Sequence, residues 1–178
     1  MIEATVDALQ RRGVAGMSFT EVLAASGAAR GAIYHHFPGG KAQLVAEAAV
    51  RNGEDVRAYL AALPAESPVA VVQAFLAAVR PVVQASAGGG GCAVAAVTVG
   101  ADDGELRQVA ATAFSAWAGQ LAERLAMAGL TPEAAADLAA MLIALLEGAH
   151  VMCRAAGTLE PFDRAARAAV ALAVAGNG

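Results

Sequence analysis

Apolar side chains recur along almost the whole chain at the spacing of an α-helical turn, which is typical of amphipathic helices. Ile2, Val6 and Leu9 form the first such stripe, and Gly13 follows it as a stop signal. Proline and glycine divide the remaining sequence into segments of helical length. The pattern therefore predicts an all-α fold, with helices over residues 1–12, 19–26, 30–37, 41–63, 68–85, 104–128, 132–156 and 160–175.

Several of these helices begin with capping signals. Ser18 followed by Glu21 has the sequence of a capping box, in which each side chain accepts a hydrogen bond from the backbone N–H of the other residue. Ser67 and Thr131 each precede a proline, so a capping hydroxyl is followed by the residue that best suits the first helical position. We therefore expect side-chain caps at these three starts, and we expect Asp102-Asp103 to open the helix over 104–128.

The apolar segment 92–99 is ambiguous because its β-branched residues permit a strand. Helices on both sides favour a short helix there instead. The four glycines of residues 88–91, which precede it, predict a linker or bend.

Composition supports a folded helical protein. Hydrophobic residues make up 58% of the 178 residues, the mean hydropathy is +0.54, and aromatic residues account for only 4%. This profile excludes disorder, and the abundance of alanine favours helices over strands. Cys92 and Cys153 lie far apart, so neither a disulfide framework nor a cysteine metal site is predicted.

The hydrophobicity calls for a membrane test. The longest uncharged stretch, residues 81–101, contains the four glycines, and the apolar stretch 138–152 is interrupted by Glu147 and His150. No basic segment precedes an apolar run at the N-terminus. We therefore expect no membrane span and a cytoplasmic protein whose surplus apolar surface is buried between subunits.

Charge is distributed unevenly along the chain. Residues 1–41 carry four basic and three acidic side chains, whereas the remainder carries eight basic and thirteen acidic ones, for a net charge of −4. The difference weakly indicates that the N-terminal piece meets an anionic partner.

The first 40 residues have the arrangement of a helix-turn-helix. Gly27 permits the sharp turn between the second and third predicted helices, because glycine readily adopts positive φ. Ile33 and Phe37 are spaced to pack against Val22. The side chains left to face a DNA major groove are Arg30, Tyr34 and His35.

Two stretches carry a resemblance to a known family: residues 18–27, SFTEVLAASG, and residues 30–41, RGAIYHHFPGGK. Together they resemble the DNA-binding domain of TetR-family transcriptional repressors, over about the first 45 residues. The segment 91–100, which begins Gly-Cys, resembles more weakly the LmrA/YxaF-like branch of that family.

The resemblance implies a helix-turn-helix DNA-binding domain over residues 1–45 and a larger helical ligand-binding and dimerisation domain over residues 46–178. It implies a homodimer, formed through the last two helices, that binds a palindromic double-stranded DNA operator and is released by a small apolar effector. It implies DNA contacts from Ser18, Thr20, Arg30, Gly31, Ala32, Tyr34, His35 and Lys41.

The larger lobe has the composition of a ligand sensor, because alanine-rich helices with few bulky side chains leave room for an apolar cavity with few polar anchors. Each residue could equally belong to an ordinary core. The residues we expect to bind the effector are Phe75, Thr98, Phe114, Trp117, Met141 and His150.

Other function classes find less support. The sequence has no nucleophile with a paired carboxylate, no metal-ligand cluster, and no phosphate loop, because residues 88–91 lack a following lysine. We therefore expect no enzyme, no cofactor and no metal. The alternative is a helical small-molecule-binding dimer module that has lost DNA binding, since Ala29 stands where the family usually caps its third helix with serine.

Overall fold

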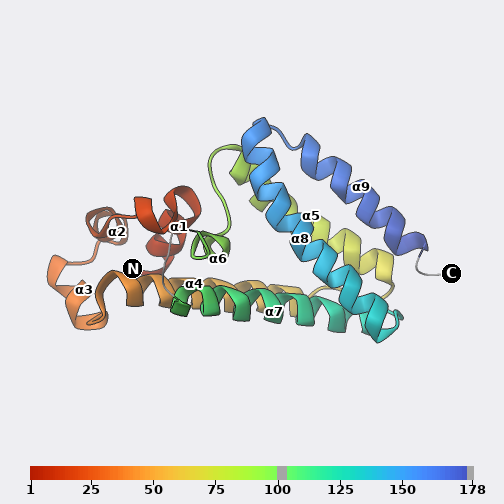
Figure 1. Cartoon of the computed structure of the whole chain (residues 1–178), viewed down its shortest axis with the longest axis horizontal. Helices are drawn as coiled ribbons and strands as arrows, with labels where there is room; N and C mark the ends of the chain where they lie inside the picture. Colours follow the sequence, from red (N-terminus) through yellow and green to blue (C-terminus); the bar gives the residue numbers. More distant parts are fainter. Residues whose placement is uncertain (100–103, 176–178) are drawn as a thin grey trace. The chain divides into compact units, whose positions relative to one another are not determined.

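The computed structural model describes residues 1–99 and 104–175, and within these ranges the chain forms nine helices and no strand (Figure 1). The predicted all-α fold is confirmed. The helices are α1 (Ile2–Gly16), α2 (Phe19–Ser26), α3 (Arg30–His36), α4 (Gly40–Ala61), α5 (Pro68–Ala87), α6 (Ala93–Ala96), α7 (Gly104–Met127), α8 (Pro132–Ala156) and α9 (Glu160–Ala175).

The helix boundaries agree with the predicted ones to within two residues, except in α1 and α6. In α1 the helix continues beyond Gly13, which is non-helical with φ 67° and ψ −178° and therefore interrupts it. Residues 92–99 contain the short helix α6 rather than a strand. The expected opening at Asp102-Asp103 lies outside the described residues.

The described residues divide into two compact units. The first unit combines Met1–Asp55 with Gly91–Ala113, and the second combines Val56–Gly90 with Phe114–Gly178. The helices α4 and α7 each contribute their first part to the first unit and their second part to the second unit. The functional boundary expected between residues 45 and 46 stays a prediction.

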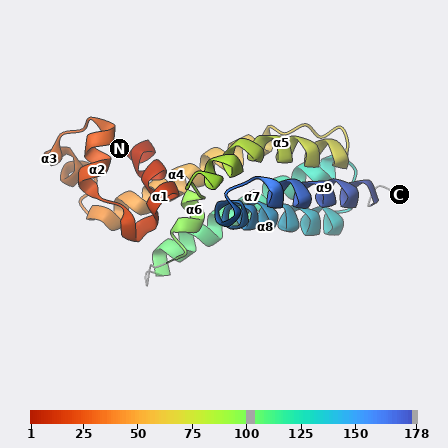
Figure 2. The ribbon, with the colours of Figure 1, turned by 90° about the horizontal axis from the view of Figure 1, so that it is seen from above.

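The first unit forms around buried side chains from α1 to α4 and α6. Leu9, Val22, Ile33 and Leu44 are almost fully inaccessible to solvent. Gly27 ends α2 in the left-handed conformation, so the predicted turn into α3 is confirmed. Figure 2 shows α1, α2 and α3 grouped around the start of α4, and α6 packs against α1.

Two of the three predicted caps are confirmed. The hydroxyl of Ser67 accepts a hydrogen bond from the N–H of Ala70 at 3.1 Å, and that of Thr131 accepts one from Ala134 at 3.3 Å. The capping box at Ser18 is wrong. The Ser18 side chain makes no capping hydrogen bond, and Glu21 instead forms an ion pair with Arg12 of α1. The guanidinium of Arg12 therefore competes with the backbone N–H of Ser18 for the Glu21 carboxylate.

The second unit is built from α5, α8 and α9, which lie side by side, together with the second part of α7 (Figure 1). Its largest buried side chains are Phe75, Trp117 and Phe162. The guanidinium of Arg80 on α5 pairs with Asp163 on α9 and lies 6.0 Å from the ring centre of Phe162. This pairing raises the pKa of Arg80 through its hydrogen bond and charge interaction with Asp163.

Two helices of the described chain, α5 and α8, are long and apolar enough to cross a membrane by length and composition. Only 33% of the most apolar window of α5 and 39% of that of α8 is buried within the chain. Each helix therefore packs one side against its neighbours and keeps apolar surface exposed.

A polar pair is buried between α5 and α8. The Oγ atom of Ser86 lies 2.5 Å from Nδ1 of His150, and both residues are buried. Because burial penalises the charged imidazolium, it lowers the pKa of His150 below its ordinary value of 6.5.

The protein should lose stability as the pH falls below 6.5, because the unfolded chain then binds a proton at His150 more readily than the folded chain does. Urea unfolding between about pH 7.5 and pH 5.5 measures this loss. In His150→Gln the amide keeps a polar contact with Ser86 but does not titrate. The free energy of unfolding should therefore depend less steeply on pH than in the wild type, because unfolding takes up one proton fewer. Equal pH dependence in the two proteins would contradict a buried, neutral His150.

Candidate nucleic-acid interface

Helix α3 has one buried side and one exposed side. Ile33 is 1% exposed and Phe37, which follows the helix, is also buried, whereas Tyr34 is 67% exposed. Arg30 and His35 are exposed as well. The predicted division of this helix into a packed side and an outward side is therefore confirmed.

The first turn of α3 has no capping side chain and only small residues after Arg30. Ala29 occupies the N-cap position and provides no side-chain hydrogen bond, while the N–H of Ala32 donates to the carbonyl of Ala29 at 2.9 Å. A Cβ atom added to Gly31 would meet no atom within 4 Å, and Ala32 beside it is half-buried. The protein itself therefore imposes no steric need for glycine at position 31, and the small residue leaves the helix surface open to close approach.

Two further predicted residues lie at the start of α2. Ser18 is half-buried at the N-cap and Thr20 is exposed in the first turn. Since Ser18 does not cap the helix, the first backbone N–H groups of α2 lack a side-chain acceptor. Amides at a helix N-terminus favour anions such as phosphate.

Lys41 lies in the first turn of α4. Its Nζ donates a hydrogen bond of 2.8 Å to the carbonyl of Met17, in the connection between α1 and α2. An ammonium group has three donors, so two remain for other acceptors. The hydrogen bond ties the start of α4 to the start of α2, which brings Lys41 near Ser18.

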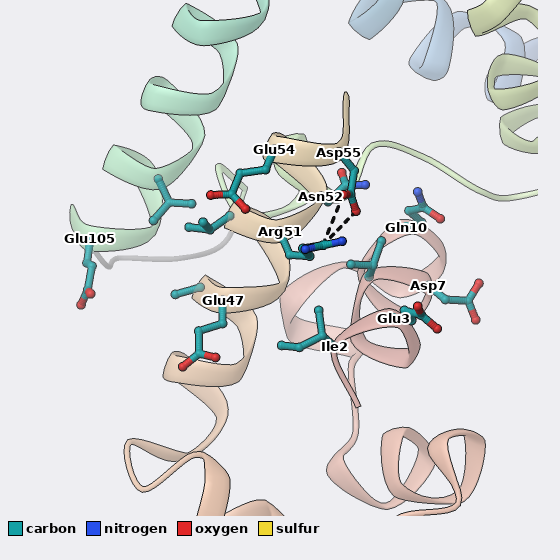
Figure 3. Close-up of a pocket in the computed structure, with 14 residues that line it drawn as sticks. Ile2, Glu3, Asp7, Gln10, Glu47, Arg51, Asn52, Glu54, Asp55 and Glu105 are labelled. Atoms are coloured by element: carbon teal, nitrogen blue, oxygen red, sulfur yellow. Dashed lines mark hydrogen bonds and ion pairs between the residues drawn. The ribbon is translucent and has the colours of Figure 1, made fainter. Parts of the chain in front are cut away.

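Acidic side chains of the first unit cluster around a pocket. A pocket of about 880 Å³ lies among α1, α4 and the start of α7, with Ile2, Val6, Val50 and Val109 among its apolar lining (Figure 3). Its only basic lining residue, Arg51, donates to Asp55 at 3.2 Å. The acidic lining residues are Glu3, Asp7, Glu47, Glu54, Asp55 and Glu105.

Asp55 pairs with Arg51 and Asp7 pairs with Arg11, but acidic side chains still outnumber basic ones, so the pocket disfavours the approach of a polyanion. The exposed side of α3 carries Arg30 and two histidines and no carboxylate. The exposed side of α3 is therefore more favourable for a polyanion than the pocket is.

Five of the six residues expected to bind an effector belong to the second unit. Phe75 and Trp117 are fully buried, and Phe114 meets Trp117 edge to face with ring centres 5.2 Å apart. Met141 is half-buried, and His150 is already bonded to Ser86.

Thr98 is the sixth residue of the expected set. It belongs to the first unit, is exposed, and donates its hydroxyl hydrogen to the Ala95 carbonyl at 2.7 Å. A surface groove of about 410 Å³ in the second unit lies between α5 and α9. It is lined by Gln73, Leu76, Asp163, Ala166, Arg167 and Val170, none of which was expected to bind an effector.

The helices α8 and α9 expose large apolar side chains. Val151 is 70% exposed and Leu172 is 58% exposed, and Met152 and Val174 are similarly open. Sequence reasoning identified the two helices but not these side chains. Such residues are apolar side chains on the side of the helix opposite the buried stripe. They can be recognised in the sequence only once the buried stripe is known.

Comparison with known proteins places both parts of the chain. Residues 1–48 match the description "Bacterial regulatory proteins, tetR family", and residues 68–168 match "Transcriptional regulator LmrA/YxaF-like, C-terminal domain". A helix-turn-helix-type transcriptional regulator of Mycobacterium tuberculosis is 33% identical over 170 residues, covering 92% of this chain and 87% of that protein. The regulator LmrA of Bacillus subtilis is 27% identical, covering 90% and 88%.

Solved structures agree with this placement. A TetR transcriptional regulator from Chloroflexus aurantiacus superposes with a TM-score of 0.72 at 25% identity, covering 96% of this chain and 90% of that one. A TetR transcriptional regulator from Legionella pneumophila gives a TM-score of 0.80 at 21% identity, covering 94% and 92%.

Proposed function

The chain belongs to the TetR family of bacterial transcriptional regulators, and we propose that it is a homodimeric repressor that binds a palindromic DNA operator and is released by a small apolar effector. Members of this family are regulators of transcription and not enzymes. The observation that carries the proposal is the outward side of α3, where Tyr34, Arg30 and His35 are exposed above a buried Ile33. Such a protein acts in the cytoplasm, where its DNA is.

In this proposal α3 enters the major groove. Arg30 reaches base edges or phosphate from the first turn, while Tyr34 and His35 contact the groove and the backbone. Gly31 and Ala32 let the helix approach the bases, which fits the open space around Gly31. Base contacts select the operator sequence, and phosphate contacts supply affinity that falls as salt rises.

Ser18, Thr20 and Lys41 would hold the DNA backbone. The two hydroxyls lie at the uncapped start of α2, and Lys41 adds a positive charge with two unused donors beside them. Phosphate contacts of this kind fix the position of the recognition helix on the duplex but do not read sequence.

Dimerisation through α8 and α9 would bury the apolar side chains that these helices expose, including Val151 and Leu172. A two-fold axis would then relate two copies of α3, which suits a palindromic operator with one half-site for each copy. The exposed apolar surface of α8 supports this interface, because water-exposed patches of that kind mark association sites.

The effector would bind in the second unit, among Phe75, Phe114, Trp117, Met141 and His150. An effector releases DNA only to the extent that it binds the DNA-incompetent state more tightly than the DNA-bound state. Thr98, which lies in the first unit, is the least supported member of the expected set.

A second candidate function is a ligand-binding dimer that no longer binds DNA. The observations that favour it are Ala29 at the N-cap of α3, which provides no side-chain hydrogen bond, and the acidic pocket of the first unit. Salt-sensitive binding to the promoter region of the protein's own gene would decide between the two candidates.

Arg30→Ala should weaken binding to that promoter DNA by about 1–3 kcal/mol, because a base or phosphate contact from α3 is lost. Fluorescence anisotropy at several salt concentrations measures the change. Arg57→Ala removes the same charge from an exposed position on the second part of α4 and should leave affinity within about twofold. Equal losses in both variants would show that only net charge matters.

Leu172→Glu should raise the dissociation constant of the dimer at least about tenfold, because it places an unpaired charge in a desolvated apolar interface. Analytical ultracentrifugation over a dilution series measures this constant. Val99→Glu is the matched control, since Val99 is 74% exposed in the first unit. A fully dimeric Leu172→Glu protein would place the interface elsewhere.

Trp117 is the only tryptophan, so its fluorescence should report effector binding in the second unit. We expect some members of a panel of small apolar molecules to change this emission, and saturating promoter DNA should weaken their binding by the factor by which they weaken DNA binding. Effector affinities that are identical with and without DNA would contradict release by an effector.

A further inference from the structure

An ion pair joins α1 to α2 beside the proposed phosphate contacts. Arg12 lies in α1 immediately before Gly13, and Glu21 lies in the first turn of α2. Their side chains meet through Nη1 of Arg12 and Oε1 of Glu21, and both remain about half exposed. Figures 1 and 2 show the two helices side by side at the N-terminal end of the chain, where they pack together.

The ion pair determines whether the Glu21 carboxylate can cap the start of α2. Glu21 occupies the position from which a carboxylate normally reaches back to the backbone N–H of the N-cap residue, here Ser18. Held by Arg12, the carboxylate points to α1 instead. With no side-chain cap from Ser18 either, the first amides of α2 stay open to an outside oxygen.

The backbone around Arg12 confines its side chain. Gly13 has a φ of 67°, in the left-handed region, and it kinks the helix. A Cβ atom built on Gly16 would lie 3.0 Å from the Cβ of Arg12. The chain is therefore packed against the root of this side chain and limits the directions in which the guanidinium can extend.

We propose that Arg12 is a positioning residue for DNA binding: it holds the Glu21 carboxylate against α1 and thereby keeps the start of α2 open for a phosphate oxygen. The inference rests on the proposed function, because it assigns the open amides and the hydroxyls of Ser18 and Thr20 to the DNA backbone. Without Arg12, Glu21 closes the capping box, occupies the amides and sets a negative charge where the phosphate must bind.

The rival role is a direct contact between Arg12 and a phosphate. A cycle of Arg12→Ala, Glu21→Gln and the double variant separates the two roles, with mixed-sequence duplex DNA at low salt as the probe. Arg12→Ala should weaken binding about fivefold, the worth of one capping interaction, and Glu21→Gln should restore most of this loss. In the wild-type background Glu21→Gln should have little effect, because the carboxylate is already held away.

A matched pair on α1 accounts for net charge. Arg11 and Asp7 also form an exposed ion pair, and Arg11→Ala, Asp7→Asn and their double variant make the same charge changes. Their effects on DNA affinity should be additive. The inference is overturned if Glu21→Gln strengthens binding by the same factor with and without Arg12, as it would if only charge mattered.

The salt dependence gives a second test. A lost direct phosphate contact lowers the slope of log affinity against log salt by about one. Under the positioning role, Arg12→Ala weakens binding with an unchanged slope, and Arg12→Lys, which keeps the cation, retains near wild-type affinity. A slope lowered by about one in Arg12→Ala would establish the direct contact instead.

A measurement without DNA separates failure of this inference from failure of the proposed function. In nuclear magnetic resonance spectra, Glu21→Gln should shift the backbone amide of Ser18 when it is added to Arg12→Ala, and it should leave that amide unshifted when it is added to the wild type. The same behaviour in both proteins would overturn the inference even if DNA binds. Absence of DNA binding by the wild type would instead overturn the proposed function. Circular dichroism melting checks that each variant is folded. Exposed ion pairs of this kind contribute little to the free energy of unfolding, so we expect all the variants to fold.

Discussion

The burial of Ile33 and Phe37 is the constraint on which the DNA-facing surface depends. An α-helix of seven residues is too short to be stable in water by itself, so α3 exists only because its apolar side is packed into the first unit. That packing fixes the rotation of the helix about its own axis. Tyr34, the next residue, is turned outward as a direct geometric result, and the surface offered to a partner is therefore determined from beneath.

The electrostatics of the first unit reinforce this arrangement. A net negative chain that binds a polyanion must separate its charges, and here the carboxylates gather at the pocket among α1, α4 and α7. The exposed side of α3 and the Lys41 end of α4 carry no acidic group in their own segments, residues 30–36 and 40–43. The negative charge at the pocket repels a polyanion, and the positive charge near α3 attracts one. This separation favours an approach of a duplex to α3 before any specific contact forms.

The fold was readable from the sequence because helix spacing, prolines and glycines are local signals. Outcomes that depend on distant residues were not readable. The capping box at Ser18 followed the local rule, but Arg12, nine positions away from Glu21, competed for the carboxylate once α1 and α2 packed together. Gly13 was read as a stop, whereas the helix resumes after it.

The open space around Gly31 bears on how such regulators diverge. Most positions in a short helix are constrained by the core that supports it, so a change of side chain there endangers folding as well as recognition. Position 31 lacks the constraint from the core, because a Cβ atom added there meets no atom within 4 Å. Substitutions at this position can therefore accumulate while the helical scaffold stays intact.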